Sequence, residues 1–123
     1  MDLGKIKLTE AKLNVLHPVT GLETGLILGV VSDSDPRVTK VRHAYTNQRL
    51  AKQKPKMTAE QLEHFNTEIL AASVVSITWT GDASWNGEQL KYTPENVKKL
   101  LEADWLKAQV AELKEDNAGF FTA

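Results

Sequence analysis

The stretch that decides the fold is GLILGVVSDSDP, residues 25–36. Its first part, Leu26–Val31, is apolar on both faces, which favours a β-strand that is covered on both faces. Asp35 is a preferred helix N-cap, and Pro36 suits the first helical position because its missing N–H has no helical partner there. The sequence therefore predicts a strand over residues 25–31 and a helix that begins at Pro36.

The residues before this stretch complete a β-hairpin. Residues 11–16 form its first strand, and Pro18, Thr20 and Gly21 form the turn. An isolated two-stranded hairpin is marginal in water, and its outer edge offers unpaired backbone groups to another chain. We therefore expect either helices of this chain or a second molecule to cover it.

Two helices are expected after the hairpin. The first runs from Pro36 to about Lys52, and its thin apolar stripe predicts that it is loosely held or completed by a partner. Lys54-Pro55-Lys56 interrupts the chain, and Thr58 with Gln61 forms a capping box for the second helix. The end of that helix, Val74–Trp79, is rich in β-branched residues. It is compatible with a last helical turn or a short strand, and we favour the helix.

The last third of the chain predicts a loop and two short helices. Residues 80–92 form the loop, with a tight turn at Asn86-Gly87. Thr93 caps a third helix, and Asp104 caps a fourth that ends near Lys114. The expected fold is mainly α with a small N-terminal β-hairpin, an α+β protein in which about four helices pack around one core. We divide this single domain, 1–123, into a hairpin region (1–34), two helices (35–79), the loop (80–92) and the C-terminal helices and tail (93–123).

Charge is segregated along the 123 residues, although the net charge is only −1. Residues 36–56 hold seven basic and no acidic residues, whereas residues 57–123 carry a net charge of −6. A basic segment is compatible with nucleic-acid binding, but Tyr45 is its only aromatic residue. We favour a solvated helix that attracts the acidic half of this chain or of a second copy.

Several function classes find no support in the sequence. Cysteine is absent, no apolar run approaches the roughly 20 residues that cross a bilayer, and the N-terminus lacks the order of a signal peptide. No metalloprotease motif, nucleophile elbow or dinucleotide fingerprint is present. We expect a soluble, cytoplasmic protein that is not an enzyme and uses no cofactor or metal.

Aromatic and basic residues supply the candidate contacts with other proteins. Trp79 and Trp105 are expected in the core, whereas Trp85 lies beside the Asn86-Gly87 turn and is expected to be exposed. Phe120 and Phe121 either fold back onto the core or dock on another protein. The candidate protein-interaction residues are Arg37, Lys40, Arg42, Tyr45, Arg49, Trp85, Phe120 and Phe121.

One ordered series of short motifs covers nearly the whole chain. It consists of His17-Pro18-Val19-Thr20-Gly21, Gly25–Leu28, Ser32–Asp35, Leu70–Val75, Trp79-Thr80-Gly81, Gly87, Tyr92–Val97, Leu100-Leu101, Trp105-Leu106, Gln109-Val110, Asn117 and Phe120. Each piece alone is unspecific, but the order and the chain length resemble the small tail assembly chaperones of long-tailed bacteriophages and related prophage proteins.

This resemblance implies a mostly helical fold with a small β element and no catalysis. It implies that the protein binds the tape measure protein in the host cytoplasm, helps to recruit tail tube subunits, and is absent from the mature virion. Self-association, through the hairpin edge or between the basic helix and acidic helices, is a further expectation.

Two other functions remain open at this point. The first is a structural head–tail or tail component that stays in the virion. The second is a small nucleic-acid-binding regulator that uses residues 36–56, for which binding would fall steeply with salt.

Overall fold

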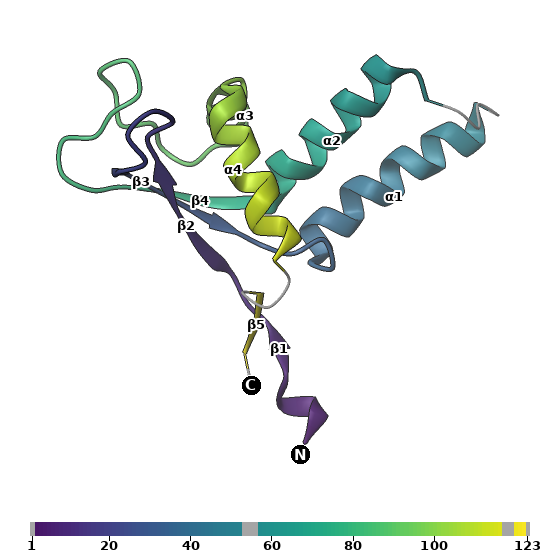
Figure 1. Cartoon of the computed structure of the whole chain (residues 1–123). Helices are drawn as coiled ribbons and strands as arrows, with labels where there is room; N and C mark the ends of the chain where they lie inside the picture. Colours follow the sequence, from purple (N-terminus) through teal and green to yellow (C-terminus); the bar gives the residue numbers. More distant parts are fainter. Residues whose placement is uncertain (1, 53–56, 117–119, 123) are drawn as a thin grey trace.

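The computed structural model describes residues 2–52, 57–116 and 120–122, and it confirms an α+β fold with four helices. In chain order the elements are a 3-10 turn (Leu3–Lys5), β1 (Lys7–Leu8), β2 (Ala11–Leu16), β3 (Glu23–Val30), α1 (Pro36–Ala51), α2 (Ala59–Ser73), β4 (Val74–Trp79), α3 (Pro94–Leu101), α4 (Asp104–Glu115) and β5 (Phe121–Thr122). Figure 1 shows the sheet beneath α3 and α4, with the α1–α2 pair extending to one side.

The main sheet is antiparallel, with the strand order β2-β3-β4. Leu28 of β3 lies opposite Leu13 of β2 and Ile77 of β4. The predicted helical course of Val74–Trp79 is therefore wrong: α2 ends at Ser73, and Val74 is already extended. The physical reason is that the second edge of β3 was still unpaired, and a β-branched segment can satisfy it.

Helices cover only one face of this sheet. Leu26, Leu28 and Val30 point into the core, whereas Ile27 and Gly29 alternate onto the other face, where Ile27 is only half-buried. Cover of the outer face by helices of this chain is thus not found among the described residues, and cover by a second molecule stays a prediction. Within β3 the apolar run places one large side chain, Ile27, on that face, and the buried Val31 lies just beyond the strand. Over Gly29 that face is covered locally by the side chain of Ser76.

The core lies between the sheet and the two C-terminal helices. Its fully buried large side chains include Leu28, Leu100, Leu106, Val110 and Phe120. Phe120 is held by the chain that precedes β2, because its carbonyl accepts a hydrogen bond from Thr9 N–H at 2.6 Å. The following residues form β5, which pairs with β1 in a second, two-stranded sheet.

Local capping chemistry sets three of the four helix starts. The side chains of Asp35, Thr58 and Thr93 each accept a backbone N–H, as the sequence predicts. Asp104 is the exception, since it is the first helical residue of α4. Ala103 occupies the N-cap without a side-chain hydrogen bond.

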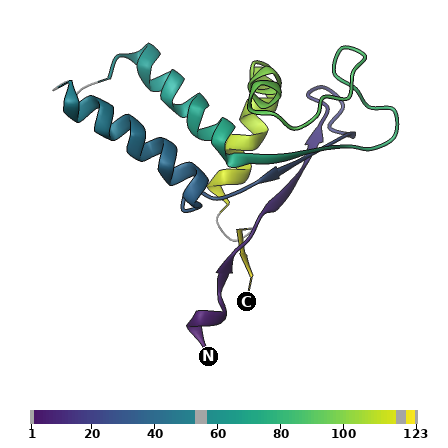
Figure 2. The same cartoon turned by 180° about the vertical axis from the view of Figure 1, so that it is seen from behind.

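The α1–α2 pair extends away from the sheet as a helical hairpin (Figure 2). Val38 is the only buried residue of α1, and the main aromatic contact between the helices is Tyr45 on Phe65, with ring centroids 4.8 Å apart. This sparse packing agrees with the thin apolar stripe of α1. The predicted break at Lys54-Pro55-Lys56 lies outside the described residues.

Candidate protein-binding site

A groove of about 770 Å³, lined by both apolar and charged side chains, lies between α2 and α4. Each helix contributes apolar side chains to it, and Leu62 remains 49% exposed there. We call this hollow the α2–α4 groove; its apolar lining residues are Ala59, Leu62, Ile69, Leu70, Ala108 and Ala111.

The groove exists because α4 contacts only part of the length of α2. Figure 1 shows α4 near the C-terminal end of α2, so the N-terminal part of α2 extends beyond it. On α4 the residues that face the groove include two alanines, Ala108 and Ala111, which leave space where larger side chains would fill it. The broad apolar face of α2 is visible in the sequence, but nothing in the sequence shows that α4 leaves part of it uncovered.

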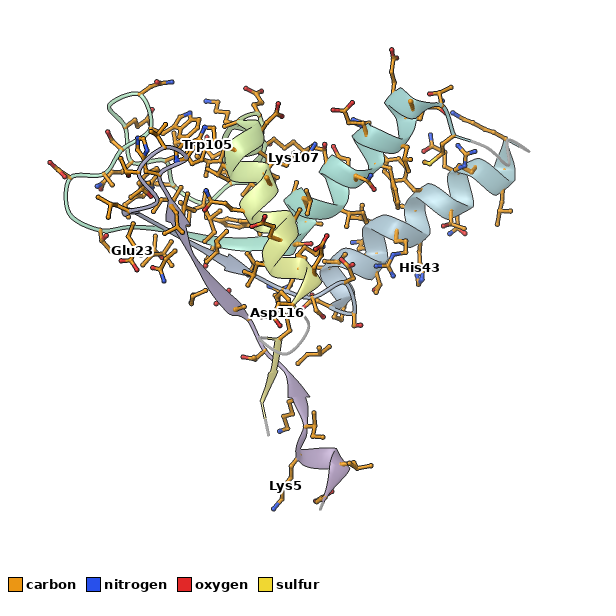
Figure 3. All side chains as sticks on the ribbon, in the orientation of Figure 1. Lys5, Glu23, His43, Trp105, Lys107 and Asp116 are labelled. Carbon is orange, nitrogen blue, oxygen red and sulfur yellow. The ribbon has the colours of Figure 1, made fainter. Side chains whose placement is uncertain are left out.

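Two lysines fix α4 against α2 along the groove. Lys107 Nζ donates to Thr67 Oγ1 at 2.7 Å, and Figure 3 shows its side chain on the α2 side of α4. Lys114 donates to Ser73 Oγ and forms an ion pair with Asp33, and its side chain is only 8% exposed. These contacts hold the groove walls in place, so a ligand finds a preformed site.

The groove is lined by four acidic and two basic side chains, so its charge is net negative, and we call these acidic side chains its acidic rim. Lys114 is already paired with Asp33, whereas Glu63, Asp104 and Glu115 make no ion pair with any other described residue. A segment that carries apolar residues on one side and basic residues at its margins would match both the lining and the rim. The geometry suits an amphipathic helix, which binds by laying its apolar face into such a groove.

The five predicted contact residues of the basic helix do not form one surface. Arg37 donates to the Asp35 carboxylate at 2.9 and 3.0 Å, and Arg42 donates to the Asp33 carbonyl at 3.2 Å. The Arg37 hydrogen bonds hold the pKa of Asp35 below its ordinary range. Lys40 is exposed and makes no hydrogen bond or ion pair with the other described residues. Two of the predicted contact residues thus serve to start α1.

Tyr45 and Arg49 face α2 instead of solvent. They line a cavity of about 300 Å³ near the distal end of the helical hairpin, together with Met57 and His64. Burial raises the pKa of Tyr45. Arg49 Nη2 is buried and has no hydrogen-bond partner among the described residues. Tyr45 is therefore mainly a packing residue of the hairpin.

The aromatic predictions need two corrections. Trp85 is half-buried against the core, and its ring centroid lies 6.4 Å from that of Trp105. At the Asn86-Gly87 turn, Trp85 forms an isolated antiparallel β-bridge with Glu88. Phe120 is 0% exposed and belongs to the core, so the alternative in which it folds back is confirmed and its place among the candidate contact residues is wrong. The side chain of Phe121 lies outside the described part of the chain. Trp79 and Trp105 pack against the core as expected.

Chemical sites are scarce in the part of the chain that the structure describes. Its residues contain no group of three or more His, Cys, Asp or Glu side chains placed to hold a metal ion. None of the described helices has both the length and the apolar character that crossing a membrane requires. Comparisons with protein-family models, with curated proteins and with solved structures gave no match.

Proposed function

We propose that this chain is a tail assembly chaperone of a long-tailed bacteriophage, which binds the tape measure protein and helps to recruit tail tube subunits. It acts in the host cytoplasm, is absent from the mature virion and self-associates. The ordered motif series supports this proposal, and the single structural observation that carries it is the α2–α4 groove with its apolar lining and acidic rim.

A groove of this kind suits a chaperone better than a structural component that stays permanently bound in the virion. Its apolar lining covers an exposed apolar helix of a client and keeps that helix from aggregating. The groove remains shallow and partly exposed at Leu62, so the interface is modest and the client can be released. The acidic rim selects client segments with basic margins and speeds their encounter.

The decisive experiment is co-purification of the chain with its tape measure protein. We expect Leu62→Glu to weaken binding by about tenfold or more, because a carboxylate in the groove loses its hydration when the client covers it. Leu50→Glu is the matched control, since Leu50 is 72% exposed on α1 and lies outside the groove lining. Equal binding by both variants would contradict the proposed site.

Mass spectrometry of purified virions separates this function from its main alternative. A chaperone is missing from the particle, whereas a head–tail or tail component is present at a fixed number of copies. Detection of the chain at such a fixed number would replace the chaperone proposal with the structural one.

A further inference from the structure

The two edges of the main sheet differ in how they are protected against pairing with a further strand. The outward edge of β2 carries the charged Lys12 and the exposed Asn14, and at Leu16 it is closed by α4. There, Gln109 accepts from Leu16 N–H and donates to Leu16 O, both at 2.8 Å. Charged residues and covering side chains are the usual means by which proteins prevent an edge strand from pairing.

The β4 edge has none of these protections. Its sequence, VVSITW, holds no charged residue and no proline. Thr80 N–H donates to Gly25 O at 2.8 Å, so the alternation of an antiparallel ladder turns the backbone groups of Thr78 toward β3 and those of Ile77 and Trp79 outward. Neither residue's outward N–H or carbonyl has a hydrogen-bond partner among the described residues. Figure 2 shows β4 in front of β3 and β2, with no helix drawn across it.

We infer that the β4 edge is a dimer interface that pairs antiparallel with β4 of a second copy of this chain. This inference concerns the chain alone and does not rest on the client proposed above. It replaces the hairpin edge expected from the sequence, because β4 already occupies that edge of β3.

A second copy fits this edge because the strand is complementary to itself. A two-fold axis at Thr78 places Ile77 opposite Trp79 of the second copy, and Trp79 opposite its Ile77. All outward backbone groups of these residues then form hydrogen bonds. The facing side chains are two aromatic–β-branched pairs on the core side and one Thr78–Thr78 pair on the outer side, and both kinds of pair stabilise antiparallel strands. The Ser76 side chain stays over Gly29 within its own sheet.

The test exploits the exposed Thr78, which would face its own symmetry mate. Light scattering of the wild-type chain over a concentration series is expected to show a particle of twice the 13.7 kDa chain mass. Thr78→Lys and Thr78→Glu should each weaken dimerisation by about tenfold, because like charges would lie directly opposite. An equal mixture of the two variants should restore the dimer, which a merely unfolded variant could not do.

The matched controls are Asn14→Lys and Asn14→Glu, which place the same charges in the same row of the sheet at the β2 edge. These variants should dimerise like the wild type. Amide exchange gives a second measure: on dimerisation Ile77 and Trp79 should gain protection and Asn14 should not. A wild type that stays monomeric, or Thr78 variants that dimerise unchanged, or a mixture that stays monomeric, would overturn the inference.

Discussion

The body of the molecule and its projecting helical hairpin are built on different principles. In the body, α3 and α4 bury Leu100, Leu101, Leu106 and Val110 against the sheet. In the hairpin, α1 buries only Val38 and α2 buries only Ser73. Since buried apolar area supplies most of the folding free energy, the body should carry most of the stability, whereas the hairpin leaves apolar surface exposed, which we propose as the client site.

The largest effect is expected at Phe120. Phe120→Ala removes a fully buried aromatic side chain and should lower the free energy of unfolding by about 3–5 kcal/mol. Urea denaturation with circular dichroism measures it. A loss of less than about 1 kcal/mol would mean that the C-terminal segment is not part of the body in solution.

A leucine pair compares the two regions with one chemical change. Leu106→Ala in the body should cost about 2–5 kcal/mol of unfolding free energy, because Leu106 is 0% exposed. Leu62→Ala in the hairpin should cost less than about 1 kcal/mol, because Leu62 is half exposed. Similar losses for both variants, measured by urea denaturation, would contradict the division.

Gly29 tests the outer face of the sheet. An added Cβ would collide with Ser76 Oγ and approach Glu10 Oε1 to 2.5 Å, so Gly29→Ala should destabilise the chain by about 1–3 kcal/mol. The double variant Gly29→Ala, Ser76→Gly should recover part of that loss, since the nearest collision is removed. Thermal denaturation compares the stability of the wild type, the single variant and the double variant. If the double variant were no more stable than Gly29→Ala, the collision with Ser76 would not be the cause of the destabilisation.

Thr58 tests how the hairpin is held together. Its side chain accepts Gln61 N–H at 3.1 Å, so Thr58→Ala should cost about 1 kcal/mol through loss of the N-cap. Thr46→Ala, an exposed change within α1, is the control and should stay within about 0.5 kcal/mol. Amide exchange of the first turn of α2 should quicken in the first variant only.

The smallest effect is the pH dependence at the start of α1. Arg37 hydrogen bonds hold the pKa of Asp35 below its ordinary value of 3.8, so this contribution is present above the unfolded-state pKa and is lost as pH falls through the folded-state pKa. Asp35→Asn keeps an N-cap acceptor but does not titrate. The stability difference between wild type and variant should be constant above about pH 5 and shrink below about pH 4. A difference that grows in acid would contradict this assignment.

Most local structure was predictable because short-range chemistry sets it. Asp35, Thr58 and Thr93 cap their helices through hydrogen bonds within three residues, and the Asn86-Gly87 turn adopts positive φ at both residues. The candidate contacts were predicted less well. Arg37 and Trp85 are residue types that are common at protein interfaces, but in this structure they contact other residues of the same chain. Arg37 donates to the Asp35 carboxylate, and Trp85 lies against Trp105.

The sequence by itself determined the helix starts, the first hairpin and the apolar residues available for a core, because caps, turns and periodicity act over a few positions. Only the tertiary structure decided that Val74–Trp79 is a strand, since that segment satisfies the backbone groups of β3, whose paired residues lie 44 to 53 positions earlier in the chain. It also decided which apolar residues stay uncovered. Leu62 belongs to the same apolar face of α2 as the half-buried Ile69 and Leu70, and it lines a groove because α4 packs near the other end of the helix. Strand pairing and helix packing depend on several distant segments at once, so they cannot be read from any single stretch of sequence.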